Sequence, residues 1–301
     1  MLKKTIYLGS PAYLSKRDNQ LNIRRPGLDG DETTDTVPIE DIGLVVLDCP
    51  QITLTQPLLT ALLERAAVVT CDDRHLPYGV AIPLYGHTTF QENFRAQLET
   101  SLPRRKQLWQ WTVKAKLHQQ AGLLSDLGLN PDPLLRWSRQ VRSGDVDNQE
   151  ARGAAYYWRE LFGDEHFVRG RDEAPPNNLL NFGYAILRAM VARAIVGSGL
   201  SPSVGIFHRN KYNPLTLADD IMEPYRPYVD GLVIDLEQRF GSTPELIERK
   251  HKQELLSLAT IDTYFDGRRS PLGVAVQRTT ASLVRAFRGE DPAIKYPTWT
   301  R

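Results

Sequence analysis

Residues 177–199, NNLLNFGYAILRAMVARAIVGSG, form the longest strongly apolar stretch of the chain. A helix drawn through this stretch is apolar on nearly every side, and such helices are buried. The stretch therefore predicts the central helix of a helical bundle. Arg188 and Arg193 interrupt the apolar run before it reaches the roughly 20 residues that cross a bilayer, so we expect no membrane span.

Helical periodicity extends on both sides of this segment, from about residue 88 to residue 301. Proline or glycine bounds most of the periodic stretches, as is usual at helix ends. The pattern therefore predicts a large all-helical domain over residues 88–301, with helices expected at 90–102, 104–127, 132–141, 146–162, 215–238, 243–258 and 271–288.

The N-terminal quarter has a different pattern, because short runs rich in β-branched residues alternate there with turn signals. One helix interrupts these strands, with Thr55 as its N-cap and leucines at helical spacing after it. We interpret residues 1–75 as a small β-rich, β-sandwich-like domain and residues 76–87 as a linker, in which GVAIPL is alternatively a last strand. The predicted fold class is α+β. The expected strands are KTIYLG, QLNIRR, TVPIE, IGLVVLD and AVVTCD.

Bulk composition excludes few functions. The net charge of +1 does not by itself indicate a polyanionic partner. Cys49 and Cys71 lack CxxC spacing, which favours reduced thiols in a cytoplasmic protein. The six histidines and two cysteines show no close ligand spacing, so a structural zinc site is disfavoured.

Three acids crowd one turn of the stretch FHRNKYNPLTLADDIMEPYRP, residues 207–227. Neighbouring carboxylates weaken a helix by a few tenths of a kcal/mol per pair, so cations, solvation or a metal ion must offset the repulsion among Asp219, Asp220 and Glu223. Pro224 lacks the N–H that would bond the carbonyl of Asp220, which predicts a kink at the acids. His208 precedes them in an irregular loop.

Glu150 is a further acid of interest, because it shares a helical stripe with Ala154 and Trp158. A carboxylate that borders a buried face needs a cation, a proton or a hydrogen-bond donor. Taken singly, Glu150 also fits a first-turn acid that favours the positive end of the helix dipole, and His208 fits an ordinary loop histidine. Taken together, two carboxylates and one imidazole suit Mg²⁺ or Mn²⁺.

The motifs QEARGAAYYW, WTVKAKLHQQA and GSGLSPSVGIFHRNKYNPLTLADDIMEPYRPYVD resemble those of the CRISPR-associated protein 1 family, the spacer-acquisition integrases, in the form found in type II CRISPR systems. The resemblance implies an N-terminal β-rich domain used for dimerisation and a helical catalytic domain. It also implies a divalent metal and an activity that joins the 3′ ends of a double-stranded spacer precursor to the CRISPR repeat. Two homodimers bridged by a dimer of CRISPR-associated protein 2 are the implied assembly.

Carried over by motif, the implied catalytic and metal-binding residues are Glu150, His208 and Glu223, with Asp220 as a possible further ligand. Many members of the family have aspartate where Glu223 stands, so either Glu223 or Asp220 is the main third ligand. The reaction expected is a metal-assisted phosphodiester transesterification, in which hydrolysis uses the same chemistry with water as the nucleophile.

Basic residues near these positions are candidate DNA contacts. Arg209 and Lys211 flank His208 and are favoured as phosphate ligands, whereas the cations of the 104–116 segment fit a solvated helix face equally well. That segment holds Arg104, Arg105, Lys114 and Lys116. Two other functions remain open from the sequence: a DNA-binding scaffold without catalysis, and a metal-dependent phosphohydrolase acting on small nucleotides.

Overall fold

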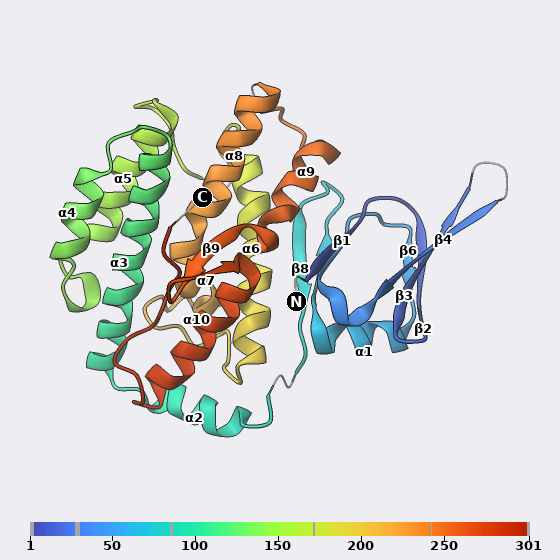
Figure 1. Ribbon diagram of the computed structural model, residues 1–301, viewed down its shortest axis with the longest axis horizontal. Helices are drawn as coiled ribbons and strands as arrows, with labels where there is room; N and C mark the ends of the chain where they lie inside the picture. The colour runs from blue at the N-terminus through green and yellow to red at the C-terminus, as the bar shows by residue number, and fades with distance from the viewer. Residues whose placement is uncertain (1–2, 28–30, 85–86, 171, 242, 300–301) are drawn as a thin grey trace. The chain divides into compact units, whose positions relative to one another are not determined.

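The computed structural model describes residues 3–27, 31–84, 87–170, 172–241 and 243–299 (Figure 1). The chain divides into two compact units, Met1–Gly86 and His87–Arg301. Strands dominate the first unit and helices dominate the second, so the predicted α+β class is confirmed.

The described residues of the first unit form two four-stranded sheets, one α-helix and one 3-10 helix. In one sheet, β1 (Lys4–Leu8), β5 (Ile42–Leu47) and β7 (Ala67–Cys71) are parallel neighbours, and β8 (Pro77–Ala81) pairs antiparallel with β7. In the other sheet the order is β4 (Glu32–Pro38), β3 (Gln20–Pro26), β2 (Ala12–Arg17) and β6 (Ile52–Leu54), with β6 parallel to β2. A short 3-10 helix, η1 (Ile39–Asp41), and α1 (Gln56–Arg65) complete this unit.

One apolar cluster holds these elements together. It combines side chains from both sheets with the buried face of α1, as expected for a layered fold around one core. Representative members of the cluster are Leu14, Leu21, Val45, Leu58, Leu62 and Val68.

Residues 76–87, interpreted as a linker, include strand β8, in which Val80 pairs with Val69 of β7. This strand corresponds to the alternative interpretation of GVAIPL as a last strand.

The second unit is built around α6 (Asn177–Gly197), which contacts α7, α8, α9 and α10 (Figure 1). The central position predicted for this segment is thus confirmed. By length and composition α6 is apolar enough to cross a membrane, contrary to the prediction that its two arginines exclude this. However, 72% of its most apolar window is buried inside the protein, as in the core helix of a folded domain.

The remaining helices of this unit follow the predicted order, although the boundaries of some differ. Before α6 lie α2 (Phe90–Glu99), α3 (Leu102–Asp126), α4 (Asp132–Gln140), η2 (Ser143–Asp145) and α5 (Gln149–Phe162). After it lie α7 (Thr216–Met222), η3 (Glu223–Tyr225), α8 (Arg226–Phe240), α9 (Arg249–Leu255), η4 (Leu256–Thr260) and α10 (Leu272–Phe287). The helix predicted at 243–258 thus begins later, at Arg249, and ends in a 3-10 turn.

The second unit is not all-helical, contrary to the prediction. Strands β9 (Asp262–Phe265) and β10 (Arg268–Pro271) form an antiparallel hairpin. Asp266 and Gly267 connect them with φ angles of 50° and 73°, which is the conformation of the tight Asp-Gly hairpin turn. The alternation of Thr263, Tyr264 and Phe265 before this turn carries the strand signal.

The C-terminal segment packs along α3. Tyr296 Oη lies 2.9 Å from Thr112 Oγ1, and Gln119 donates a hydrogen bond to the carbonyl of Pro297. Gly122 provides space for the ring of Trp299, since a Cβ at residue 122 would lie 2.2 Å from Trp299 Cγ. The helix α3 is therefore covered by residues from the far end of the chain.

Candidate active site

The first turn of α5 places Glu150. Both oxygens of the Asp145 side chain accept hydrogen bonds from this helix end, one from the N–H of Gln149 and one from the N–H of Glu150, each at 2.9 Å. Two orphan donors of the helix terminus are thereby satisfied, as at a capped N-terminus. Asp145 therefore fixes the position from which the Glu150 side chain extends.

Glu223 lies where the helix carrying the three acids changes its geometry. The α-helix ends at Met222, and Glu223 begins a 3-10 turn with Pro224 as its second residue. The predicted break at Pro224 is thus confirmed, but the break does not expose the acid, because Glu223 is only 7% exposed. A buried carboxylate of this kind requires compensating charge.

That charge comes from two cations. Arg226 Nη2 lies 2.8 Å from Glu223 Oε1, and Lys116 Nζ lies 2.6 Å from Glu223 Oε2. Burial on its own would raise the pKa of Glu223, but Arg226 and Lys116 outweigh it and lower that pKa to about 2. Glu223 is therefore ionised throughout the physiological range.

Lys116 joins the two predicted glutamates. It extends from α3, and its ammonium donates a hydrogen bond to Glu150 Oε1 while it pairs with Glu223 Oε2. Burial opposes the charge of Lys116, yet Glu223 and Glu150 together raise its pKa above the ordinary value. Carboxylates from α5 and η3 thus converge on one cationic position.

The contact between Lys116 and Glu223 is an ion pair rather than a well-directed hydrogen bond. The two atoms are close, but within the described part of the chain no hydrogen bond of good geometry reaches Glu223 Oε2, which is fully buried. A buried carboxylate oxygen that is held by an ion pair alone is a suitable ligand for a hard cation.

Asp220 shapes the loop that carries His208. Its fully buried carboxylate accepts hydrogen bonds from the N–H groups of Ile206 at 2.6 Å and Phe207 at 2.9 Å, both on Oδ2. Oδ1 faces His208, with the backbone N–H at 3.3 Å and the ring Nδ1 at 2.5 Å. Both oxygens of Asp220 are therefore engaged inside the protein, and Asp220 orients His208.

His208 is held on its other side by aromatic rings. The ring of Phe207 stacks on Trp109 with centroids 4.4 Å apart, and His208 meets Trp109 edge-on at 5.5 Å. The hydrogen bond to Asp220 is the main cause that raises the pKa of His208, against the opposing effect of burial, and the charges of Glu223 and Glu150 raise it further. Because Nδ1 is occupied by Asp220, Nε2 is the ring nitrogen left for chemistry.

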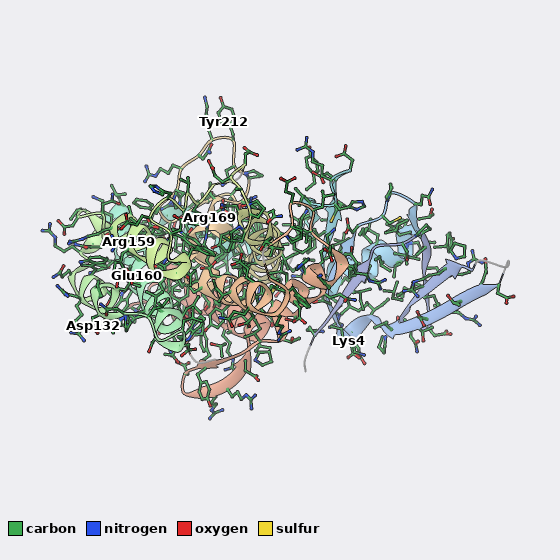
Figure 2. The ribbon with its side chains drawn as sticks, turned by 90° about the horizontal axis from the view of Figure 1, so that it is seen from above. Lys4, Asp132, Arg159, Glu160, Arg169 and Tyr212 are labelled. Carbon is green, nitrogen blue, oxygen red and sulfur yellow. The ribbon has the colours of Figure 1, made fainter. Side chains whose placement is uncertain are left out.

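The loop that follows His208 projects away from the rest of the second unit, and Figure 2 shows Tyr212 at its tip. Its far end is anchored by Asn213, which donates a hydrogen bond to Asp219, while Arg188 binds both Asn213 and Asp219. Arg209 and Lys211, the predicted phosphate contacts, are exposed on this loop. The loop is thus fixed at both ends and presents cations to solvent beside His208.

The basic residues predicted on α3 have different positions. Lys116, predicted as a DNA contact, is buried here between the two glutamates and is not presented to solvent. Arg104 donates hydrogen bonds to three backbone carbonyls near the C-terminus, those of Ala286, Asp291 and Pro292. Arg105 donates to four backbone carbonyls, those of Gln97, Leu98, Thr100 and Gly205. Both arginines tie segments of the fold together. Lys114 is partly exposed and lies 5.4 Å from the centre of the Trp111 ring.

A buried network behind Glu223 was not anticipated from the sequence. Arg226 lies 4.8 Å from the centre of the Tyr184 ring, and the hydroxyl groups of Tyr184 and Tyr157 both donate to the carboxylate of Asp230. Burial raises the pKa of Asp230 to about 6. These contacts hold Arg226 in position against Glu223, and nothing in the spacing of single residues indicates them.

The predicted ligands are thus only partly assembled. Among the residues that the structure describes, no three metal-ligating side chains are close enough to hold an ion as they stand. Glu150 and Glu223 do share one cation position, which the Lys116 ammonium occupies. Two carboxylate oxygens, one of them without a hydrogen bond, and a nearby imidazole are a donor set that suits Mg²⁺ or Mn²⁺.

Known proteins are similar to this chain over most of its length. A family model described as CRISPR associated protein Cas1 matches residues 6–266. The CRISPR-associated endonuclease Cas1 of Neisseria meningitidis is 37% identical over 279 residues, which cover 87% of this chain and 90% of that protein. A second Cas1 endonuclease, from Pyrobaculum aerophilum, is 28% identical over 86% of this chain and 92% of its own length.

Solved structures share the fold at low sequence identity. A casposase bound to its integration product has a TM-score of 0.77 and 18% identity, covering 97% of this chain and 92% of that one. A CAS1 protein from Thermotoga maritima has a TM-score of 0.75 and 18% identity, covering 99% of this chain and all of that one.

Proposed function

Because this chain belongs to the CRISPR-associated protein Cas1 family, we propose that it is a metal-dependent DNA integrase and endonuclease that inserts spacer DNA into a CRISPR array. The observation that carries the proposal is the convergence of Glu150 and Glu223, from separate elements, on one buried cation position beside His208. Relatives that cover most of this chain are named endonucleases, which supports phosphodiester chemistry.

The proposed residues have distinct roles. Glu150 and Glu223 would hold the divalent ion, and His208 would offer Nε2 either to that ion or to the proton of the reacting hydroxyl. Asp220 keeps the imidazole in place through Nδ1. When bound, Mg²⁺ or Mn²⁺ supplies neutralisation of the negative charge at the phosphate.

The reaction is a direct exchange of ester bonds. The 3′-hydroxyl of the spacer attacks a phosphorus atom of the repeat, a new P–O bond forms, and the bond to the departing 3′-oxygen breaks. The proton lost by the attacking hydroxyl is balanced by the proton that the leaving oxygen gains. No covalent intermediate with the protein is needed, because water or a DNA hydroxyl serves as nucleophile at the same site.

DNA reaches this site along the exposed loop, where Arg209 and Lys211 are the proposed phosphate contacts. We further propose that the chain works as a homodimer and that two homodimers are bridged by a Cas2 dimer, with the β-rich unit as the dimerisation domain. Neither Cys49 nor Cys71 forms a disulfide in the described part of the chain, which is compatible with work in the cytoplasm.

The test is a strand-transfer assay. Purified protein, the partner Cas2 and a short DNA duplex are mixed with a repeat-containing plasmid, with Mg²⁺, Mn²⁺ or EDTA. Glu150→Gln, Glu223→Gln and His208→Ala are each expected to abolish joining while DNA binding in a gel-shift assay is kept. Glu160→Gln is the matched control, because Glu160 lies on the same helix ten residues, or about 15 Å, beyond Glu150.

The same assay separates the other candidate functions. Joining at the wild-type rate by Glu150→Gln and Glu223→Gln with Mn²⁺ present would show that the site is assigned wrongly. DNA binding that is indifferent to EDTA, with no product from any variant, would identify a scaffold. Turnover of mononucleotides without joining would identify a phosphohydrolase.

A further inference from the structure

Lys116 is a charged side chain in an unusual place. Its residue is 7% exposed, and it reaches from the buried face of α3 to carboxylates that lie 34 and 107 positions away in sequence. Lysine is almost never buried unless it is paired, and Lys116 is paired with two carboxylates. A cation held so specifically by the two proposed metal ligands calls for a functional explanation.

The charges around the site differ in what they serve. Arg226 pairs with Glu223 Oε1 and is also held against the Tyr184 ring. Lys116 contacts both Glu150 and Glu223, so it is the cation that the two carboxylates share. Without Lys116 the two carboxylates would repel each other, and Glu150 would lose the ion pair that draws it towards Glu223.

The Lys116 ammonium also occupies the position that a divalent ion bound to both glutamates would need. Mg²⁺ binds its oxygen ligands at roughly 2.0–2.1 Å. The ammonium is 2.6 Å from Glu223 Oε2 and is hydrogen-bonded to Glu150 Oε1, so an ion that bound both of these oxygens would overlap it. Lysine has a flexible four-carbon stem, which lets its ammonium leave a position that a rigid side chain would block.

We propose that Lys116 is an internal counter-cation that keeps Glu150 and Glu223 together in the metal-free protein and yields its position when a divalent ion binds. This proposal rests on the proposed function in one respect, which is that the incoming ion is Mg²⁺ or Mn²⁺. It assigns Lys116 as a positioning residue that acts through the two glutamates. This role explains why Lys116 is buried between Glu150 and Glu223, whereas a contact with DNA would not.

Thermal unfolding of the full-length protein with and without metal tests the proposal. Lys116→Met keeps an unbranched side chain, one atom shorter than lysine, and removes its charge. In EDTA we expect its Tm to fall by about 10 °C, because one partner of a buried ion pair has been removed from a unit of this size. In saturating Mn²⁺ the Tm should return most of the way to the wild-type value, because the ion replaces the missing charge.

Metal affinity gives the second readout. Isothermal titration with Mn²⁺ is expected to show tighter binding to Lys116→Met than to the wild type, by about tenfold, because the ion no longer competes with the ammonium. Lys114→Met is the matched control: Lys114 lies two positions earlier on α3 and is partly exposed beside Trp111. Lys114→Met should change neither the difference between the Tm in EDTA and the Tm in Mn²⁺ nor the affinity for Mn²⁺.

A purely structural lysine would behave differently. An equal loss of Tm in EDTA and in Mn²⁺, or an unchanged Mn²⁺ affinity, would overturn the proposal. If Lys116→Met does not fold, the double variant Lys116→Met/Glu150→Gln decides, because removing one carboxylate should restore folding in EDTA only if the charge balance is the cause. A double variant that also fails to fold in EDTA would count against the proposal.

The proposed function is judged separately. Strand joining does not enter these thermal and titration measurements. If Lys116→Met differs from the wild type in Tm and Mn²⁺ affinity as expected, but the wild type joins no DNA, this inference is supported and the proposed function is overturned.

Discussion

Replacing Asp220 by asparagine tests whether one carboxylate positions both the loop and the imidazole of His208. Asparagine has nearly the same shape but no charge, and only one of its two polar atoms accepts hydrogen bonds. Three short contacts depend on the carboxylate: the N–H of Ile206 at 2.6 Å, the N–H of Phe207 at 2.9 Å and His208 Nδ1 at 2.5 Å.

The size of the effect follows from these contacts. A hydrogen bond to a charged group contributes roughly 1.5–3 kcal/mol, whereas a neutral one contributes about 1 kcal/mol. Losing charge assistance at three bonds therefore costs about 3 kcal/mol of unfolding free energy. For a unit of this size that corresponds to a Tm lower by roughly 6–12 °C.

The pH dependence has a definite sign. Asp220 is the main cause that raises the pKa of His208, so in Asp220→Asn that pKa should fall. Since the folded pKa of the wild type exceeds the unfolded value of roughly 6.5, the charged pair stabilises the protein below that pH, and this part is lost as the pH rises through the folded pKa. The difference in stability between wild type and Asp220→Asn should therefore be larger at acid pH and shrink, without vanishing, at alkaline pH.

The assay is thermal unfolding in EDTA across this pH range, together with NMR titration of the histidine ring protons. A His208→Gln variant identifies the His208 signal among the six histidines. Asp219→Asn is the matched control, because the Asp219 carboxylate binds Arg188 and Asn213 and Asp219 is the residue next to Asp220. An unchanged His208 pKa together with a Tm within about 2 °C of the wild type would refute the positioning role of Asp220.

Three further predictions follow from the geometry of the site. The folded state lowers the pKa of Glu223 to about 2, so ionised Glu223 stabilises the folded protein at pH values above its unfolded pKa of about 4.5. This contribution, up to about 3 kcal/mol, is lost as the pH falls from about 4.5 to about 2. Unfolding free energies measured across this range should show the decline in the wild type but not in Glu223→Gln. Gly153→Ala should cost about 1–3 kcal/mol in urea unfolding, because the added Cβ would lie 2.2 Å from Leu117 Cδ2 between α5 and α3, and an unchanged midpoint would mean that Leu117 can move away. Arg209→Ala and Lys211→Ala should each weaken DNA binding for all sequences and reduce the slope of log K against log salt by about 1, and an unaltered slope would show that these cations do not contact phosphate.

Local patterns predicted the parts of the fold that are set by local chemistry. The apolar segment around Phe182 and Ile186 had to be buried whatever surrounded it, and the break at Pro224 follows from a missing N–H. Glu150 and Glu223 were selected because a carboxylate beside a buried or crowded face needs a cation, and they do meet at one.

The role of Lys116 was missed although a signal existed. Residues 109, 113, 116 and 120 recur at helical spacing, and Trp109, Val113 and Gln120 are all buried with Lys116. A lysine on a buried stripe indicates an internal ion pair, whereas its positive charge alone suggested a phosphate contact. The Asp-Gly pair at 266–267 was likewise an available hairpin signal.

Other parts of the site depend on contacts between distant segments. Asp220 binds loop residues 12 to 14 positions earlier, and whether a helical acid turns towards a loop or towards an ion is decided by that loop's path. The support of Arg226 by Tyr184 joins two helices whose packing no single-sequence pattern specifies.

The residues after α10 bear on how shortened versions of this chain are designed. A truncation after Phe287 would keep the helices described for the second unit, yet it would remove Tyr296 and Trp299 from α3 and expose Thr112 and Gly122 to water. Such a fragment would be weakened along the very helix that supplies Lys116. Inactivity in it would report a damaged scaffold and would not locate a DNA-binding tail.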